Sequence, residues 1–259
     1  MPEDLCAERP LFGGAIVSTF PLRFVDVSYI RQVPDHQEVF VDPARDESLI
    51  FELLDLKTDV ADQGSATWFL QDLASEQDAE GTMSFTVQYL PPQLAASTTL
   101  APPSNVEYFD DDCVGEVRCH GGGRKDFSVC GAMSKYAGAL VLEQSGVFEA
   151  DGLRCRSSPA IITTAVGQMA ISKGRQGREA QNIVKVYLAN LRLKDVATDV
   201  LITAYEPMLI NPLSETAATV GAGLPVPAAQ SGCLPMADVF KSAVTTFKVN
   251  DWSLFGAVA

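Results

Sequence analysis

The chain has 259 residues and a mass of 27.8 kDa, which is enough to bury a full hydrophobic core in one domain. Its 33 acidic residues outnumber its 19 basic residues, so the formal net charge is −14 and the isoelectric point is about 4.5. A surface of this sign repels a phosphate backbone and attracts basic protein surfaces, so we expect no nucleic-acid partner.

The first six residues lack the basic and apolar regions of a secretory signal, and no apolar run approaches the ~20 residues that span a membrane. We therefore expect an intracellular protein with no membrane span. The sequence has no basic cluster of the nuclear-localisation type, so entry into the nucleus would need diffusion or a partner. Its six cysteines are spread along the chain, unlike a small disulfide scaffold, and we expect reduced thiols.

Residues 11–17 form a short apolar run that contains a glycine pair, which predicts a strand that begins at a bend. Residues 26–31 are typical of one capped helical turn that leads the chain to Pro34. Because proline fixes its own φ and biases the preceding residue towards extended backbone, Pro34 marks a turn before the next strand.

Residues 33–42 place two carboxylates, Asp35 and Glu38, at the start of a short apolar strand. Side chains of a strand alternate between its two faces, so Glu38 shares a face with Phe40, and Val39 shares the other with Val41. We expect the two valines to point into the core. Glu38 and Phe40 would then face outward beside Asp35 and form a patch that contacts a partner.

Two helices are expected next. Leu49, Ile50, Leu53 and Leu54 form an apolar stripe, which predicts a helix over residues 46–57 with Lys57 in its last turn. Residues 63–76 allow a second helix. Alternation over residues 83–89 then predicts a half-buried strand that ends at a proline pair.

Residues 91–135 show no sustained period, so we interpret them as an inserted irregular loop. Strand patterns return over residues 139–142, 160–166 and 169–171, and residues 183–193 and 199–205 predict a hairpin. A surface loop is expected over residues 209–232, followed by an amphipathic helix that begins at Pro235. The pattern predicts one α+β domain over residues 1–259, with helices packed on a mainly antiparallel sheet.

Two kinds of cofactor site are considered and not favoured. The glycine-rich segments 121–126 and 174–178 lack the spacing of a phosphate loop, and solvated turns are the simpler interpretation. Cys113, Cys119, His120 and Cys130 could supply four zinc ligands, but their spacings differ from those of structural zinc sites. We therefore expect neither a cofactor nor a bound metal.

Nucleophilic catalysis needs a base beside the nucleophile, and His36 and His120 are the two histidines of the chain. No G-x-S-x-G elbow is present, and a solvated surface imidazole explains His36 better than catalysis does. Asp35 and Glu38 could form a general acid and base pair, but nothing around them predicts a closed pocket. From the residues alone, a partner contact and a plain solvated strand end remain equally open for these two acids.

Residues 11–15, 26–40 and 47–54 closely resemble the Ran guanine nucleotide release factor family, the Mog-type Ran-binding proteins. The resemblance continues more loosely through the expected hairpin and residues 252–256. It implies an α/β/α sandwich similar to that of PsbP-like photosystem subunits. It also implies that the chain binds the GTPase Ran and promotes release of its nucleotide, without being an enzyme, in support of nuclear protein import.

In this family, the acids of a P-D-x-Q-E motif are implicated in Ran binding, and they match Asp35 and Glu38 here, with Gln37 between them. The resemblance thus implies a partner-binding site made of Asp35, Gln37, Glu38 and Phe40, with His36 at the variable position. We expect a monomer in the nucleus and cytoplasm that contacts Ran and leaves room for Ran-binding accessory proteins. The alternative is a PsbP-like scaffold that binds something other than a GTPase.

Overall fold

The computed structural model describes residues 4–77, 86–87, 141–155, 158–172 and 178–256. The expected insertion at 91–135 lies outside these residues, and so do the four candidate zinc ligands, the glycine-rich segment 121–126 and most of segment 174–178. The expectations for those segments therefore remain predictions.

The described chain contains strands, helices and single 3-10 turns. The strands are β1 (Cys6–Leu11), β2 (Ile16–Pro21), β3 (Val25–Asp26), β4 (Gln37–Asp42), β5 (Glu47–Asp55), β6 (Thr86–Val87), β7 (Val141–Cys155), β8 (Ser158–Ile171), β9 (Asn182–Leu193), β10 (Thr198–Leu209) and β11 (Lys248–Val249). The α-helices are α1 (Ser65–Gln77), α3 (Glu215–Val220) and α4 (Met236–Thr245). The 3-10 turns are Phe12–Gly14, Asp62–Gly64, Arg178–Ala180, Lys194–Val196, Ala228–Ser231 and Trp252–Phe255.

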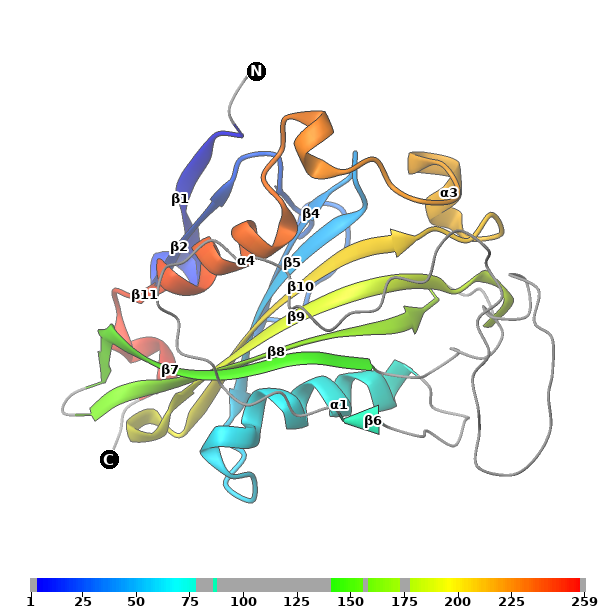
Figure 1. Cartoon of the computed structure of the whole chain (residues 1–259). Coiled ribbons are helices and arrows are strands. Elements are labelled where there is room, and N and C mark those ends of the chain that lie inside the picture. The colour runs from blue at the N-terminus through cyan, green and yellow to red at the C-terminus, as the bar shows by residue number, and fades with distance from the viewer. Residues whose placement is uncertain (1–3, 78–85, 88–140, 156–157, 173–177, 257–259) are drawn as a thin grey trace, which may run out of the picture.

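A large sheet forms the middle of the molecule, with strand order β3-β4-β5-β10-β9-β8-β7-β6 (Figure 1). Its neighbouring strands are antiparallel except for β6 and β7, which are parallel. A second, smaller sheet has the order β1-β2-β11. Helix α1 packs against β8 and β9, whereas α4 packs against β2 and β10. The expected α+β class, an α/β/α sandwich with a mainly antiparallel sheet flanked by helices, is thereby confirmed.

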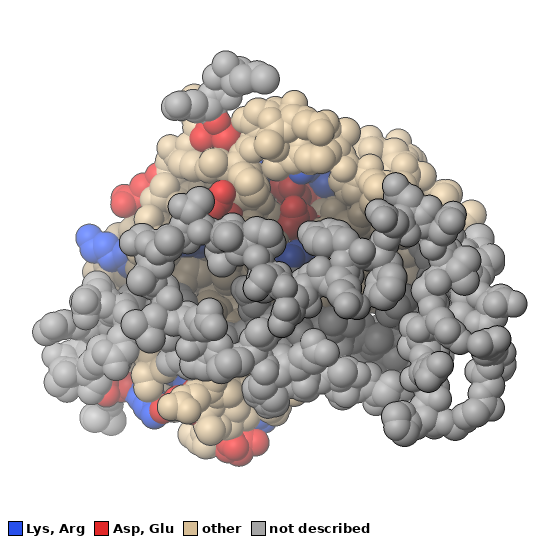
Figure 2. Space-filling model, in the orientation of Figure 1, with Lys and Arg blue, Asp and Glu red and all other residues tan. Residues whose placement is uncertain are grey.

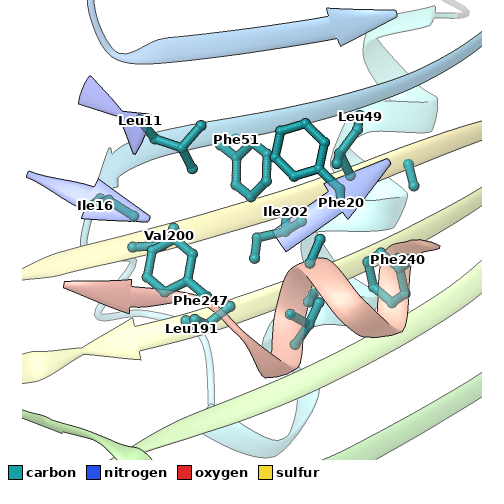
Figure 3. Close-up of a cluster of buried hydrophobic side chains, with 14 of the residues drawn as sticks. Leu11, Ile16, Phe20, Leu49, Phe51, Leu191, Val200, Ile202, Phe240 and Phe247 are labelled. Atoms are coloured by element: carbon teal, nitrogen blue, oxygen red, sulfur yellow. The ribbon is translucent and has the colours of Figure 1, made fainter. Parts of the chain in front are cut away.

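A hydrophobic core lies on each face of the large sheet, and the alternation along its strands assigns each side chain to one core or the other. On β10, Val200 and Ile202 contribute to the core beneath α4 and the small sheet, while Leu201 contributes to the core beneath α1. Figure 3 shows the first of these cores, where side chains of the small sheet, the large sheet and α4 meet. A strand with two covered faces needs apolar residues at successive positions, which β9 and β10 supply.

Several expected elements are confirmed: the helix at 63–76 is α1, the hairpin is β9–β10, and the terminal helix is α4. The helix expected over residues 46–57 is wrong, because this segment is strand β5. Its apolar residues serve both faces of the sheet. Leu49 and Phe51 enter one core and the half-buried Leu54 packs against the other, so the spacing that imitates a helical stripe belongs to a strand with apolar residues on both faces.

Arg23 lies among three carboxylates and holds the start of the chain to the tip of the β4–β5 hairpin. Its Nε is 2.8 Å from Asp4 Oδ2, and its Nη1 is 2.6 Å from both Asp42 Oδ2 and Glu47 Oε2. Burial by itself lowers the pKa of Arg23, but the hydrogen bonds to Glu47, Asp4 and Asp42 raise the pKa above its ordinary value overall. We call Arg23, Asp4, Asp42 and Glu47 the Arg23 cluster.

The Arg23 cluster also reaches the segment that leads into α4. Arg23 Nη2 donates to the carbonyl oxygen of Leu234 at 3.2 Å, and Leu234 N donates to Asp4 Oδ2 at 3.1 Å. Arg45 adds a second cation, with Nε 2.8 Å from Glu47 Oε1 and Nη1 3.0 Å from the Val226 carbonyl oxygen. These bonds satisfy most of the charge that the fold buries at this point.

At the other end of the large sheet, Asp199 is fully buried and tied to Arg192. Arg192 Nε lies 3.0 Å from Asp199 Oδ1, and Lys57 N donates to Asp199 Oδ2 at 2.8 Å. The guanidinium of Arg192 also donates to the carbonyl oxygens of Lys57 and Val60. The loop between β5 and α1 is thus fastened to the β9–β10 hairpin.

Candidate partner-binding site

The segment that joins β3 to β4 carries the acidic motif. Gln37 N donates to the carbonyl oxygen of Pro34 at 2.9 Å, which closes a turn with Asp35 and His36 at its tip. Both tip residues are exposed. Within the described part of the chain, the Asp35 carboxylate makes no hydrogen bond or ion pair, so it is available to an external cation. We call residues 27–36 the β3–β4 loop.

Gln37 is held by its neighbour across the sheet and faces Glu52 in the β4–β5 register. Its Nε2 donates to Glu52 Oε1 at 2.6 Å, and His36 Nε2 lies 3.5 Å from the same oxygen. Gln37 therefore positions the Glu52 carboxylate, and its side-chain amide is already engaged within the protein.

Glu38 points to the opposite face and supports the turn between β1 and β2. Its Oε1 accepts a hydrogen bond from Phe12 N at 2.7 Å. That turn has left-handed backbone at Phe12, with φ of 48°, and at Gly13, with φ of 67°. The carboxylate thus supplies an acceptor to a backbone amide in an unfavourable conformation, which a short turn needs.

Burial raises the pKa of the Glu38 carboxyl above its usual value, the hydrogen bond from Phe12 opposes this shift, and the nearby Asp26 charge adds to it. A raised pKa means that the folded state binds this proton more tightly than the unfolded state. The stability that the protonated Glu38 carboxyl contributes is present at acid pH, and it is lost as the pH rises through the pKa of Glu38 in the folded state.

We expect Glu38→Gln to remove this pH dependence while keeping an acceptor for Phe12 N. Wild type should lose stability relative to Glu38→Gln as pH rises from about 4 towards 7. Urea unfolding of both proteins across this range measures the difference. A carboxyl titration by NMR that placed the Glu38 pKa below its ordinary value would contradict the expectation.

Phe40 corrects one part of the expected site. Glu38 and Phe40 do share a face, but this face points into the core and not outward. The Phe40 side chain is only 3% exposed, and its ring centroid lies 4.9 Å from that of Phe20. Val39 is also buried, because both faces of β4 are covered there. Phe40 therefore supports the site from behind and offers no contact area to a partner.

The exposed apolar surface near the acids comes instead from Tyr29 and Ile30, which are 93% and 77% exposed. They sit in the expected capped turn: Ser28 N donates to Asp26 Oδ1, and the amides of Ile30 and Arg31 both donate to the Val27 carbonyl oxygen. The signal in the sequence was a pair of large apolar residues inside a polar turn, which no core pattern explained.

In the face shown in Figure 2, small groups of acidic and basic side chains lie among uncharged ones, and no broad basic patch is visible among the described residues. In the described part of the chain, no helix has the length and apolar character that crossing a membrane requires.

The sequence model of the family described as "Ran-interacting Mog1 protein" matches residues 9–112 and 130–207, a range that includes the whole β3–β4 loop. This chain belongs to the Mog1 family. A zebrafish relative named Ran guanine nucleotide release factor is 30% identical over 212 residues, which are 81% of this chain and 83% of the relative. A Dictyostelium discoideum relative, named probable Ran guanine nucleotide release factor, is 25% identical over 96% of this chain and 95% of its own.

Among solved structures, the Saccharomyces cerevisiae Ran-binding protein Mog1p aligns with 98% of this Mog1-family chain and all of its own, at 18% identity and a TM-score of 0.47. A cyanobacterial PsbP from Synechocystis aligns with 95% of this chain and 93% of its own, at 11% identity and a TM-score of 0.39.

Proposed function

We propose that this Mog1-family chain binds the small GTPase Ran, promotes release of its guanine nucleotide and supports nuclear protein import. The family is described as Ran-interacting, the zebrafish relative is named a Ran guanine nucleotide release factor, and a fission-yeast relative is named a nuclear import protein. The observation that carries the proposal is the exposed carboxylate of Asp35, which stands at the tip of the β3–β4 loop within the matched segment.

The chemistry of a GTPase explains how a carboxylate can act. Such proteins hold their nucleotide with a phosphate-loop lysine and Mg²⁺. An acid that pairs with a cation near the nucleotide, or displaces the metal, stabilises the nucleotide-free state. Because binding of the two ligands is linked, the nucleotide and this protein then weaken each other's affinity for Ran, which favours loss of the nucleotide.

In this proposal the protein is a regulator without covalent catalysis, works as a monomer in the nucleus and cytoplasm, and takes no cofactor. Asp35 contacts a basic group of Ran directly, and Gln37 keeps the Glu52 carboxylate in place. Glu38 keeps the adjoining turn in shape. Accessory proteins that bind Ran can join the complex without changing these roles.

The proposal is tested by the release of a fluorescent guanine nucleotide from purified Ran. Adding the wild-type chain in excess should speed release of GDP or GTP, and immobilised chain should retain nucleotide-free Ran more strongly than loaded Ran. Bovine serum albumin at the same concentration is the control. Unchanged release together with no retention in any nucleotide state would overturn the proposal and favour a scaffold that binds another partner.

A further inference from the structure

We propose that Tyr29 and Ile30 form the apolar anchor of the partner contact and insert into an apolar depression of the partner that is flanked by basic side chains. This inference rests on the proposed function and deepens it, because it assigns the main desolvated contact to residues outside the acidic motif.

The first support is that Tyr29 and Ile30 are exposed although the turn that carries them is held by hydrogen bonds. Tyr29 is the most exposed large hydrophobic side chain of the described residues, and Ile30 follows it directly. Their turn is nonetheless fixed: Ile30 N and Arg31 N lie 2.9 Å and 3.0 Å from the Val27 carbonyl oxygen, and Ser28 N lies 2.8 Å from Asp26 Oδ1. A prearranged turn loses little conformational freedom on binding, so more of the contact energy appears as affinity.

The second support is the attachment of the turn to the core. Val27 is buried, and its amide donates to the Val39 carbonyl oxygen at 3.0 Å on strand β4. The backbone thus places Tyr29 and Ile30 on the outside of the molecule while their neighbour is held inside. An aromatic and an aliphatic side chain displayed this way are typical of the central contacts of protein interfaces.

The third support is that acidic residues lie along the same loop as the apolar pair. The loop that carries the apolar pair is bounded by Asp26 at its start and Asp35 at its tip, and Asp35 is the acid assigned to the partner. A partner face that suits this loop offers apolar area for the two side chains and cations for the flanking carboxylates. A second copy of this chain, which carries a net charge of −14, lacks that complement.

The test compares Tyr29→Ser/Ile30→Ser with Leu224→Ser, a matched change at an 82% exposed side chain in the segment after α3. We expect the double variant to weaken binding to Ran by about tenfold to a thousandfold, as loss of central interface residues does. Leu224→Ser should bind like wild type. Thermal unfolding of each variant should match wild type, since none of these side chains is buried.

Three results would overturn the inference. If the double variant bound Ran within about twofold of wild type, the pair would lie outside the contact. Binding of Ran by the wild-type protein would still support the proposed function in that case. Equal weakening by Leu224→Ser would show a general effect of exposed apolar area. A concentration-dependent dimer of wild type, abolished by the double variant in sedimentation, would assign the pair to self-association.

Discussion

Replacing Arg23 with methionine should lower the free energy of unfolding by about 3–5 kcal/mol, because it leaves three carboxylates without their shared cation. The side chains of Asp4, Asp42 and Glu47 are 8%, 5% and 1% exposed, so water cannot take over the role of the guanidinium. Methionine has a length close to that of the arginine stem, so the loss reports charge and hydrogen bonding more than volume. Urea denaturation monitored by circular dichroism measures it.

Arg31→Met is the matched control, since Arg31 is exposed and should change stability by less than about 0.5 kcal/mol. Asp42→Asn in the Arg23→Met background should restore about 1 kcal/mol or more. It removes one negative charge, keeps the Oδ1 that accepts from Ala44 N, and adds a donor near Glu47. A loss below about 1 kcal/mol for Arg23→Met, or no recovery in the double variant, would contradict this account of the Arg23 cluster.

Asp35→Asn should weaken binding to Ran by about 30-fold to several thousandfold, which corresponds to the ~2–5 kcal/mol lost when one partner of a desolvated charge pair is removed. Asparagine keeps the shape of the side chain, so the effect isolates its charge. Because Asp35 is exposed, the free energy of unfolding should change by less than about 0.5 kcal/mol. Titration calorimetry and release of labelled nucleotide measure binding and function separately.

Variants of Glu38 distinguish a direct contact with the partner from support of the turn between β1 and β2. Glu38→Ala removes the acceptor of Phe12 N and should lower stability as well as binding, whereas Glu38→Gln retains the acceptor and should be at least as stable as wild type near pH 7. Asp238→Asn, at an exposed acid of α4, controls for the change in net charge. If Asp35→Asn bound Ran like wild type, the direct contact would have to lie elsewhere; if Asp238→Asn weakened binding equally, the effect would be general electrostatics.

The layered α+β arrangement was predictable because several segments carry a clear period. Helix α4 shows an apolar stripe that ends in polar residues, and β9 and β10 are rich in β-branched residues around a short turn. Strand β5 was not predictable in the same way. Apolar residues stand on its buried face and on its half-buried face, so the sequence lacks an alternation of two, and Leu49, Ile50, Leu53 and Leu54 fit a helix equally well.

The motif singles out a candidate site in the sequence, but it does not say how the side chains of that site are oriented. Alternation correctly paired Glu38 with Phe40, yet it cannot say which face of a strand is inward when both are covered, and Val39 and Phe40 are both buried. The Arg23 cluster had no local signal, because its partners come from three separate segments and a buried arginine looks like any other in a sequence. Exposure of Tyr29 likewise depends on the fold around it.

The Arg23 cluster has a consequence for synthesis of the chain. Arg23 leaves the ribosome close behind Asp4 and shortly before Asp42 and Glu47, but the Leu234 carbonyl that it binds comes 211 residues later. At ~5–20 residues per second, that interval is about 10–40 s. During this time the nascent chain also lacks α4, the helix that covers one face of the large sheet. The early strands therefore expose an apolar face during this interval. Synthesis of residues 234–245 then supplies both the helix that covers this face and the last hydrogen-bond partner of the Arg23 cluster.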